Sequence, residues 1–276
     1  MVKWRDAKLN DGMPDSLPKP AQSPALLIGI VLTLLAVVAH RFLPERRLAI
    51  DPANTTSAFF PVESFTDAHA DFRWIKQSDF HYACKFPDEP VRQGCGFIFM
   101  LADPADASKG TDLSHFKSLN MTVSYTGKAQ YFRVAIRNFD PRFSNHQDAN
   151  SPKFNYVNLP TRDLNQRIVL NMSEFAVAEW WAASYNHPRM YSRPDVRNAT
   201  VLNFDLQGDL TGTEHEIHLE NVEFVGDWIS AEYWYLGILC AWMLLGTTYG
   251  VSQWVRLRSA HRAQRQKIAE LAQEKE

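Results

Sequence analysis

SLNMTVSYTGKAQYFRVAIRN, residues 118–138, contains the pattern that decides the fold. Apolar residues alternate with polar ones in each half of this stretch: Leu119, Met121, Val123 and Tyr125 in the first, and Phe132, Val134 and Ile136 in the second. Because successive side chains of a strand point to opposite faces, the alternation predicts two β-strands that each bury one face. Gly127 and Lys128 separate them and are typical of a tight turn, so we expect a β-hairpin.

The rest of the region between residues 51 and 227 also favours strands. Further strands are expected at residues 95–101, 154–159, 166–170, 201–206 and 216–225. In the last of these the inward-facing phase changes between Leu219 and Val222, which predicts a β-bulge near Glu220 and Asn221. Residues 172–184 are expected to form one or two helical turns on a connection. Short strands separated by turn signals predict a mainly β fold, an extracytoplasmic β-sandwich of the jelly-roll type.

Residues 229–258, ISAEYWYLGILCAWMLLGTTYGVSQWVRLR, predict a transmembrane helix. Residues 236–251 carry no charge, and about twenty helical residues cross a hydrocarbon core of ~30 Å. Aromatic residues that favour the headgroup level flank the run at both ends: Trp228, Tyr233, Trp234 and Tyr235 before it, and Trp254 after it. A buried core helix is the alternative, but such a helix needs neither aromatic belt.

The charge of the flanking residues changes sign across this span. Residues 198–255 contain no lysine or arginine, whereas five basic residues follow: Arg256, Arg258, Arg262, Arg265 and Lys267. Basic flanks stay in the cytoplasm, so the C-terminus is predicted inside and the preceding domain outside. A shorter apolar run at residues 25–40 predicts a first, uncleaved span, with a cleaved signal peptide as the alternative.

The expected organisation is therefore a two-span protein of the bacterial inner membrane, with both termini cytoplasmic and a periplasmic central domain. The predicted segments are a cytoplasmic tail (1–23), a first transmembrane helix (24–43), a periplasmic β-sandwich sensor domain (44–228), a second transmembrane helix (229–253) and a cytoplasmic signalling helix (254–276).

The three cysteines divide between these segments. Cys84 and Cys95 lie in the predicted extracytoplasmic domain, and Cys240 lies in the predicted second span. A closely spaced pair outside the cytosol predicts a disulfide between Cys84 and Cys95. Two buried free thiols are the alternative. Zinc is disfavoured because no third and fourth ligand follow at zinc-finger spacing.

No catalytic motif occurs in the chain. With 276 residues, 22% of them charged, and a net charge of −2, the composition gives no sign of nucleic-acid binding. Walker, HExxH, GxSxG and glycine-rich nucleotide motifs are missing, so no catalytic residue, metal or cofactor is predicted. Two weaker metal patterns occur. Glu214, His215, Glu216 and His218 suggest one, but on a strand Glu214, Glu216, His218 and Glu220 share one face, which a solvated outer face explains better. Asp103, Asp106 and Asp112 are loop carboxylates without EF-hand spacing.

Two loops rich in aromatic and polar residues, 137–162 and 180–193, are the candidate ligand-binding segments. Aromatic faces stack on sugar rings, while amide and guanidinium groups bind hydroxyls or carboxylates. Packing of these rings into the core is the alternative, and only one ring of the pair Trp180 and Trp181 is expected to face outward. The candidate residues are Trp180, Trp181, Tyr185, Arg189, Tyr191, Arg193, Phe139 and Asn145.

The C-terminal residues predict a weakly pairing coiled coil. Spacings of three and four residues separate Trp254, Leu257, His261, Gln264, Ile268, Leu271 and Lys275. The seam is only partly apolar, which suits a homodimer whose pairing can switch; a solvated juxtamembrane helix is the alternative. The pattern reaches Glu276 without a helix stop signal, so an output domain is expected to follow.

Three stretches together resemble the sensory half of bacterial membrane-bound diguanylate cyclases, the GGDEF-domain proteins. HEIHLENVEFVGDWIS resembles the last strand of a galactose-binding-like sandwich, AEYWYLGILCAWMLLG the second span, and RLRSAHRAQRQKIAELAQEKE the helix that precedes a GGDEF domain. No GGDEF or GGEEF motif is present, so the resemblance assigns no catalytic role to any residue of this chain. The same layout could precede a histidine kinase or a chemoreceptor signalling domain.

The hypothesis is a membrane-bound signal-transduction sensor module. Its periplasmic domain would detect a carbohydrate-like small molecule or a partner protein, and two spans and a coiled coil would carry the signal to a cytoplasmic diguanylate cyclase. The alternative from another class is a structural or assembly subunit of a cell-envelope complex without a small-molecule ligand.

Overall fold

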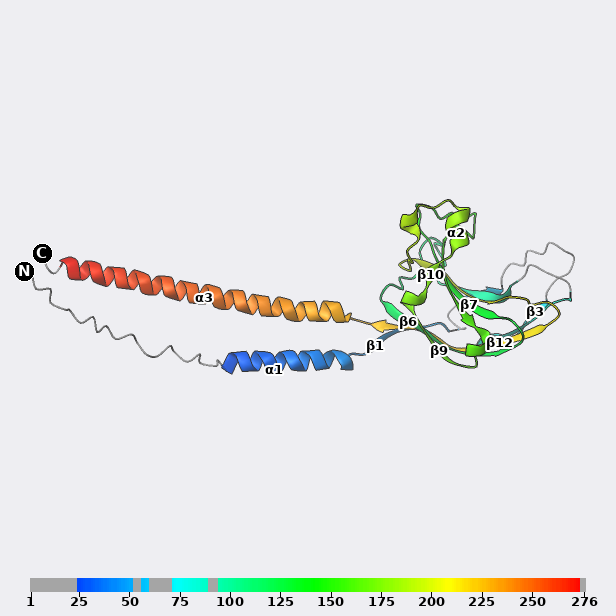
Figure 1. Cartoon of the computed structure of the whole chain (residues 1–276), viewed down its shortest axis with the longest axis horizontal. Helices are drawn as coiled ribbons and strands as arrows, with labels where there is room; N and C mark the ends of the chain where they lie inside the picture. The colour runs from blue at the N-terminus through cyan, green and yellow to red at the C-terminus, as the bar shows by residue number, and fades with distance from the viewer. Residues whose placement is uncertain (1–23, 52–55, 60–70, 89–93, 274–276) are drawn as a thin grey trace, which may run out of the picture. The chain divides into compact units, whose positions relative to one another are not determined.

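The computed structural model describes residues 24–51, 56–59, 71–88 and 94–273, and the chain forms two compact units (Figure 1). One unit is Pro44–Ser230, and the other combines the chain ends, Met1–Leu43 and Ala231–Glu276. The predicted cytoplasmic tail, residues 1–23, lies outside the described residues.

The Pro44–Ser230 unit is built on two antiparallel sheets of six strands each. The first, called sheet I, has the order β3-β4-β12-β6-β9, and β1 pairs with the other end of β12. Its strands are β1 (Glu45–Ala49), β3 (Asp71–Lys76), β4 (His81–Lys85), β6 (Phe116–Thr126), β9 (Gln166–Asn171) and β12 (Glu214–Asp227).

The second sheet, called sheet II, has the order β10-β8-β7-β11-β5-β2. Its strands are β2 (Ser57–Phe59), β5 (Cys95–Met100), β7 (Tyr131–Asn138), β8 (Lys153–Pro160), β10 (Ala176–Val177) and β11 (Ala199–Gln207). Short 3-10 turns occupy His40–Phe42, Gln77–Asp79, Thr161–Asp163, Met172–Glu174 and Arg189–Tyr191, and α2 (Glu179–Ser184) is a short helix. The mainly β sandwich and the predicted strands are confirmed, and residues 172–184 contain the expected helical turns.

The chain changes sheet at most of its connections, as in a jelly roll. It passes from β4 in sheet I to β5 in sheet II, back to β6, and on to β7. The hairpin expected between β6 and β7 is therefore wrong: the two strands lie in different sheets, and Gly127 sits in the crossover between them. The Tyr125 hydroxyl holds this crossover by accepting the Ala129 N–H at 2.7 Å. The alternation of apolar and polar residues correctly predicted which side chains of β6 and β7 point into the core. It carries no information about which strand each of them pairs with.

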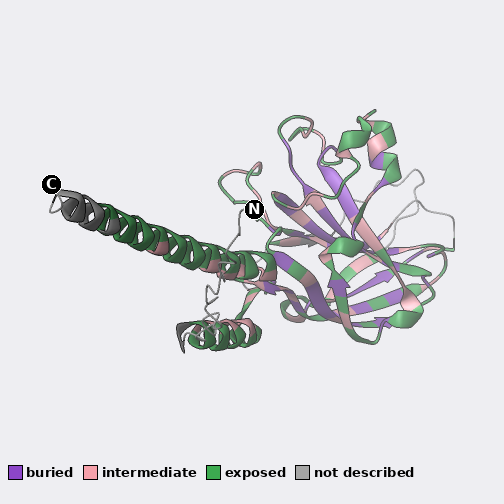
Figure 2. Cartoon of the chain, turned by 60° about the vertical axis from the view of Figure 1, so that its left-hand side comes forward, coloured by how far each residue is buried: buried purple, intermediate pink, exposed green. Residues whose placement is uncertain are grey.

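Buried residues from both sheets form one core of rings and aliphatic side chains, and Figure 2 colours buried positions purple along the strands. Its largest members include Tyr82, Phe97, Phe99, Phe132, Phe204 and Phe224. The predicted disulfide is confirmed and joins Cys84 on β4 to Cys95 on β5, so it links the two sheets. The predicted bulge is also confirmed, because the register of β12 on β6 shifts between Glu220 and Glu223, with Asn221 at φ +54°.

The other unit contains α1 (Pro24–Ala39) and α3 (Ala231–Gln273), which pack along each other. The Trp242 indole donates to the Thr33 hydroxyl at 2.8 Å, and the Trp234 indole donates to the Ala36 carbonyl at 3.0 Å. Gly29 allows this approach, since a Cβ there would lie 2.9 Å from the Trp242 ring.

Within α3, Ala231–Ala263 is long and apolar enough to cross a membrane, whereas Leu26–Phe42 is a shorter apolar helix. The two-span topology stays a prediction. The predicted signalling segment continues α3 without a break to Gln273. Of the predicted seam, Trp254 and Leu257 are exposed, and Lys275 and the side chains of Gln264, Ile268 and Leu271 lie outside the described residues.

Candidate ligand-binding site

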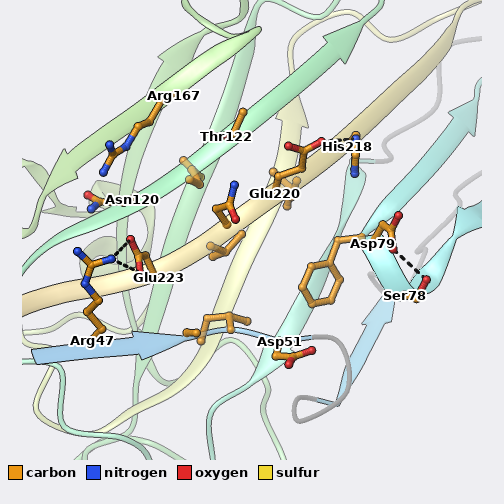
Figure 3. Close-up of a pocket in the computed structure, with 17 residues that line it drawn as sticks. Arg47, Asp51, Ser78, Asp79, Asn120, Thr122, Arg167, His218, Glu220 and Glu223 are labelled. Atoms are coloured by element: carbon orange, nitrogen blue, oxygen red, sulfur yellow. Dashed lines mark hydrogen bonds and ion pairs between the residues drawn. The ribbon is translucent and has the colours of Figure 1, made fainter.

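The outer face of sheet I has a hollow of about 750 Å³ at the point where β12 changes neighbours (Figure 3). β12 pairs with β4 as far as His218 and with β1 from Glu223 onward, which leaves a notch at the bulge. Two contacts between polar side chains occupy its wall: Arg47 pairs with Glu223 at 3.3 Å, and a ring nitrogen of His218 lies 3.1 Å from Glu220. No described side chain lining this hollow is a buried polar group without a partner.

The outer face of sheet II has a smaller hollow of about 300 Å³, which we call the sheet II pocket. Its position follows from strand alternation: β11 turns Leu202, Phe204 and Leu206 into the core and the intervening residues to the outer face. The pocket is lined by Gly94, Arg133, Arg137, Asn150, Phe154, Trp180, Asn203, Asp205 and Gln207.

A buried ion pair forms one wall of the sheet II pocket. Arg133 on β7 and Asp205 on β11 are register partners, and the guanidinium donates to the carboxylate through Nε at 2.9 Å and Nη2 at 2.5 Å. The Asp205 side chain is 3% exposed, and it also accepts a hydrogen bond from Gln207. Burial raises the pKa of Asp205, and the hydrogen bonds from Arg133 and Gln207 oppose this rise.

Asn203 lies deeper in the pocket and has an unusual environment. Its side chain lines the pocket although the residue is only 1% exposed, and neither amide atom has a hydrogen-bond partner among the described residues. The adjacent residues on the neighbouring strands are Ala135 and Ile98, whose side chains neither donate nor accept hydrogen bonds. Leaving a buried amide unpaired costs about 1–3 kcal/mol, so this arrangement needs an explanation.

Arg137 and two aromatic rings form the remaining wall. The Arg137 guanidinium donates to the Ala149 carbonyl at 2.6 Å and lies 4.9 Å from the centre of the Phe154 ring. Burial, reinforced by the positive charge of Arg133, lowers the pKa of Arg137 to about 10. The Trp180 ring is 5.2 Å from Phe154 and 43% exposed, so an aromatic surface remains open beside the pocket.

A second apolar cluster covers the part of sheet II next to this pocket. Ala135, Phe154, Ala178 and Trp181 are its buried members. The Trp181 indole donates to the Ser151 carbonyl at 3.0 Å, which fixes α2 on the loop between β7 and β8. Packing of this cluster buries part of the outer face of sheet II.

The structure brings few of the candidate binding residues into the sheet II pocket. Trp180 lines it, whereas Trp181 is fully buried, so one ring of the pair does face outward. Tyr185 and Tyr191 pack on the cluster around Trp181. The remaining candidates lie nearby without lining the pocket: Phe139 stacks on His146 at 4.7 Å, Asn145 accepts the Gln147 N–H at 2.9 Å, and Arg189 and Arg193 are exposed.

Sequence reasoning missed the residues that form the floor and the charged wall. Arg133 on β7 and Asn203, Asp205 and Gln207 on β11 lie outside both candidate segments, whereas Arg137 begins the 137–162 segment without being one of the candidate residues. The alternation of β7 and β11 places these residues on the outer face of the sheet, but alternation alone predicts that such a face is exposed to solvent. Nothing local indicated that α2 and its loop would cover that face.

The two weaker metal patterns have structural roles. Asp103, Asp106 and Asp112 each accept a backbone N–H two residues ahead, at 2.8 to 3.0 Å, as turn-forming carboxylates. Glu214, Glu216 and Glu220 are exposed on the outer face of β12. Among the described residues, no group of three or more histidine, cysteine or acidic side chains is placed to hold a metal ion.

Comparison with known proteins gives structural likeness alone. No protein-family model matches the sequence, and no curated protein matches it. A family 11 carbohydrate-binding module from Clostridium thermocellum, solved with a β-1,3-1,4-mixed-linked tetrasaccharide, is similar at 13% identity and a TM-score of 0.44, over 66% of this chain and 96% of that one. The family 11 module of the cellulase Lic26A-Cel5E from the same organism is similar at 10% identity and a TM-score of 0.43, over 68% and 98%. Likenesses this distant give no information about what this chain binds.

Proposed function

We propose that this chain is the sensory and membrane-anchoring part of a signalling protein, and that the sheet II pocket binds a sugar-like ligand. One observation carries the proposal: Asn203 is buried in the pocket, and neither of its amide atoms has a hydrogen-bond partner in the described part of the chain. A ligand that supplied one acceptor and one donor would satisfy the amide and recover its desolvation cost.

The composition of the pocket wall favours a polyhydroxyl compound. Asn203 offers a donor and an acceptor, Asp205 offers acceptor oxygens, and the arginines offer donors. Sugar hydroxyls both donate and accept, and the apolar face of a sugar ring packs on an aromatic ring such as that of Trp180. The volume of about 300 Å³ is at the lower end of the range for small-molecule sites, which suits one sugar ring.

The test uses two buried asparagines of the same sheet. Asn155 is as buried as Asn203, but its amide donates to the Ile136 carbonyl at 3.1 Å and to the Asp195 carbonyl at 2.9 Å. We expect Asn203→Leu to raise the free energy of unfolding by about 1–3 kcal/mol and to abolish sugar binding, because the amide serves the ligand and not the fold. Asn155→Leu, the matched control, should lower the free energy of unfolding.

Binding is measured by calorimetry on the full chain in phospholipid nanodiscs, because maltoside detergents would present sugar headgroups to the pocket. A monosaccharide panel that includes glucose, galactose and their uronates is the probe. Wild-type-like sugar binding by Asn203→Leu, or no binding of any panel member by the wild type, would contradict the proposal.

The signalling part of the proposal rests on sequence. We infer that α1 and α3 anchor the chain in the inner membrane with the β-sandwich in the periplasm, and that α3 pairs in a homodimer and joins an output domain of the diguanylate cyclase kind. The continuity of α3 from Ala231 to Gln273 supports such coupling, because one rigid helix can transmit a rotation or shift.

The competing function is a structural subunit of a cell-envelope complex. A stable hetero-complex on mild extraction, together with no sugar binding, would favour it.

A further inference from the structure

Resting on the proposed sugar site, we propose that its ligand is an acidic sugar, a monosaccharide unit bearing a carboxylate such as a uronate. The geometry points to this class because two guanidinium groups and one carboxylate line the sheet II pocket. Asp205 neutralises Arg133, with which it forms a two-point contact at 2.9 and 2.5 Å. The second guanidinium, on Arg137, remains to receive an anion.

Arg137 has no acidic partner within ion-pair distance in the described part of the chain. Its guanidinium donates to a neutral acceptor, the Ala149 carbonyl at 2.6 Å, and lies over the Phe154 ring at 4.9 Å from its centre. A guanidinium has five N–H donors in a planar fork, which fits the two oxygens of a carboxylate. Burial makes an uncompensated cation expensive, so an incoming carboxylate would be bound more strongly here than at an exposed arginine.

Asp148 is a carboxylate outside the pocket lining whose charge also acts on Arg137. Its oxygens already accept the Tyr185 hydroxyl at 2.5 Å and the Asn150 N–H at 2.8 Å. The effect of Asp148 on Arg137 is smaller than that of Asp205. Burial also raises the pKa of Asp205, and protonation of that carboxyl would increase the positive charge of the pocket. The net charge of the described lining residues is therefore positive whichever form Asp205 takes.

A simple inorganic anion would use only part of this site. Phosphate could bind Arg137, but it would offer no apolar face to Trp180 and would leave the buried Asn203 amide without a donor and acceptor pair matched to a ring. An acidic sugar uses all three features: a carboxylate for Arg137, hydroxyls for Asn203, and a ring face for the exposed indole. The small volume favours a terminal or single residue of such a sugar.

The test compares sugars that differ only at C6. The full chain in phosphatidylcholine nanodiscs is titrated with glucose and glucuronate, with galactose and galacturonate, and with inorganic phosphate. We expect one uronate to bind about tenfold more tightly than its neutral parent, the size of one charge-assisted contact, with the preference decreasing as salt rises. Equal affinity for a uronate and its neutral parent sugar would overturn the acidic-sugar inference, and so would phosphate that binds as tightly as the uronate. Either result would leave the proposed sugar site unaffected. No binding of any sugar would instead remove the proposed function.

Two substitutions shift the charge in opposite directions. Arg137→Gln should bring the ratio of uronate to parent affinity close to one, whereas Asp205→Asn, which keeps an acceptor for Arg133, should raise that ratio by several-fold. Arg137→Lys keeps the charge without the fork and should retain part of the preference. Arg162→Gln is the control, since the Arg162 side chain is 85% exposed and outside the pocket. If Arg137→Gln does not fold, Asp205→Asn still tests the inference, because an unchanged ratio of uronate to parent-sugar affinity in that variant would overturn it.

Discussion

Cys84 on β4 and Cys95 on β5 form a disulfide that crosses from one sheet of the sandwich to the other. Both cysteines are fully buried, with Cys84 placed opposite His215 of β12 and Cys95 placed opposite Leu206 of β11. The bridge therefore ties the two sheets together where the chain passes from β4 to β5.

Removal of this bridge should lower stability without changing the fold. In the chain-entropy model a loop this short contributes about 2–3 kcal/mol, so the double variant Cys84→Ala, Cys95→Ala should lose about that free energy of unfolding. Peptide mapping under non-reducing conditions should show the cross-linked peptide and leave Cys240 reduced. Alkylation of Cys84 and Cys95 in the native, unreduced protein would contradict the assignment.

The pair of Arg133 and Asp205 should matter most when one partner is lost alone. Arg133→Met strands a buried carboxylate and should lower the free energy of unfolding by about 3–5 kcal/mol, as seen when buried pairs are broken. Adding Asp205→Leu should recover most of that loss, because the stranded carboxylate is then removed. Denaturant unfolding measures both effects. Lys76→Met, the control, breaks an exposed ion pair with Asp79 and should change the free energy of unfolding little. A similar loss of stability in Arg133→Met, in the Arg133→Met, Asp205→Leu double variant and in Lys76→Met would show that the unpaired Asp205 carboxylate does not cause the loss.

His215 should make the sandwich sensitive to acid. The residue is fully buried between the hydroxyls of Tyr125 at 2.9 Å and Thr213 at 2.8 Å, and burial lowers the pKa of its imidazole. In the unfolded chain a histidine takes up a proton near pH 6.5, while the folded form resists it. As pH falls below about 6.5 the unfolded state binds more protons, so the free energy of unfolding should decrease.

Thermal unfolding between pH 7.5 and 5 measures this dependence. His215→Gln should flatten the curve over this range, although it will also lower stability at pH 7.5. His115→Gln is the control, since that side chain is 62% exposed. A slope of the same size in His215→Gln and in the wild type would place the acid sensitivity elsewhere.

The charge step across residues 236–251 predicts the membrane topology. In a background with Cys240→Ala, a membrane-impermeant thiol reagent should label a cysteine introduced at Asn150 in intact spheroplasts. The same reagent should reach a cysteine at Gln273 only after lysis. Labelling at Gln273 in intact spheroplasts would reverse the predicted orientation.

If the C-terminal part of α3 is a signalling switch, the output should depend on the heptad register of this helix. With the chain fused to a diguanylate cyclase domain, four residues inserted after Gln266 would offset the heptad seam, while seven residues would restore it. Cyclic-di-GMP output should change sharply in the first fusion and largely recover in the second. Equal output from all three fusions would make the helix a passive tether.

Several features could be predicted from the sequence because their causes are local. Alternation over residues 118–125 and 130–138 was sufficient to locate β6 and β7, and the phase change in β12 located the bulge at Asn221. The close spacing of two cysteines in a predicted extracytoplasmic domain was sufficient to pair them. In contrast, β1 to β4 were not predicted, since these short strands carry weak alternation and depend on partners far along the chain, such as β12.

Only the tertiary structure decided which sheet each strand joins and which outer face becomes a pocket. β6 and β7 are adjacent in sequence yet belong to different sheets: β6 pairs with β12 and β9, whereas β7 pairs with β11 and β8. Arg133 and Asp205 are 72 residues apart and meet only through the register of β7 on β11. Asn203 looks like a solvated strand residue until the neighbouring cluster around Trp181 covers that face. Periodicity reports the direction of a side chain, whereas burial of an outward-facing one depends on non-local packing.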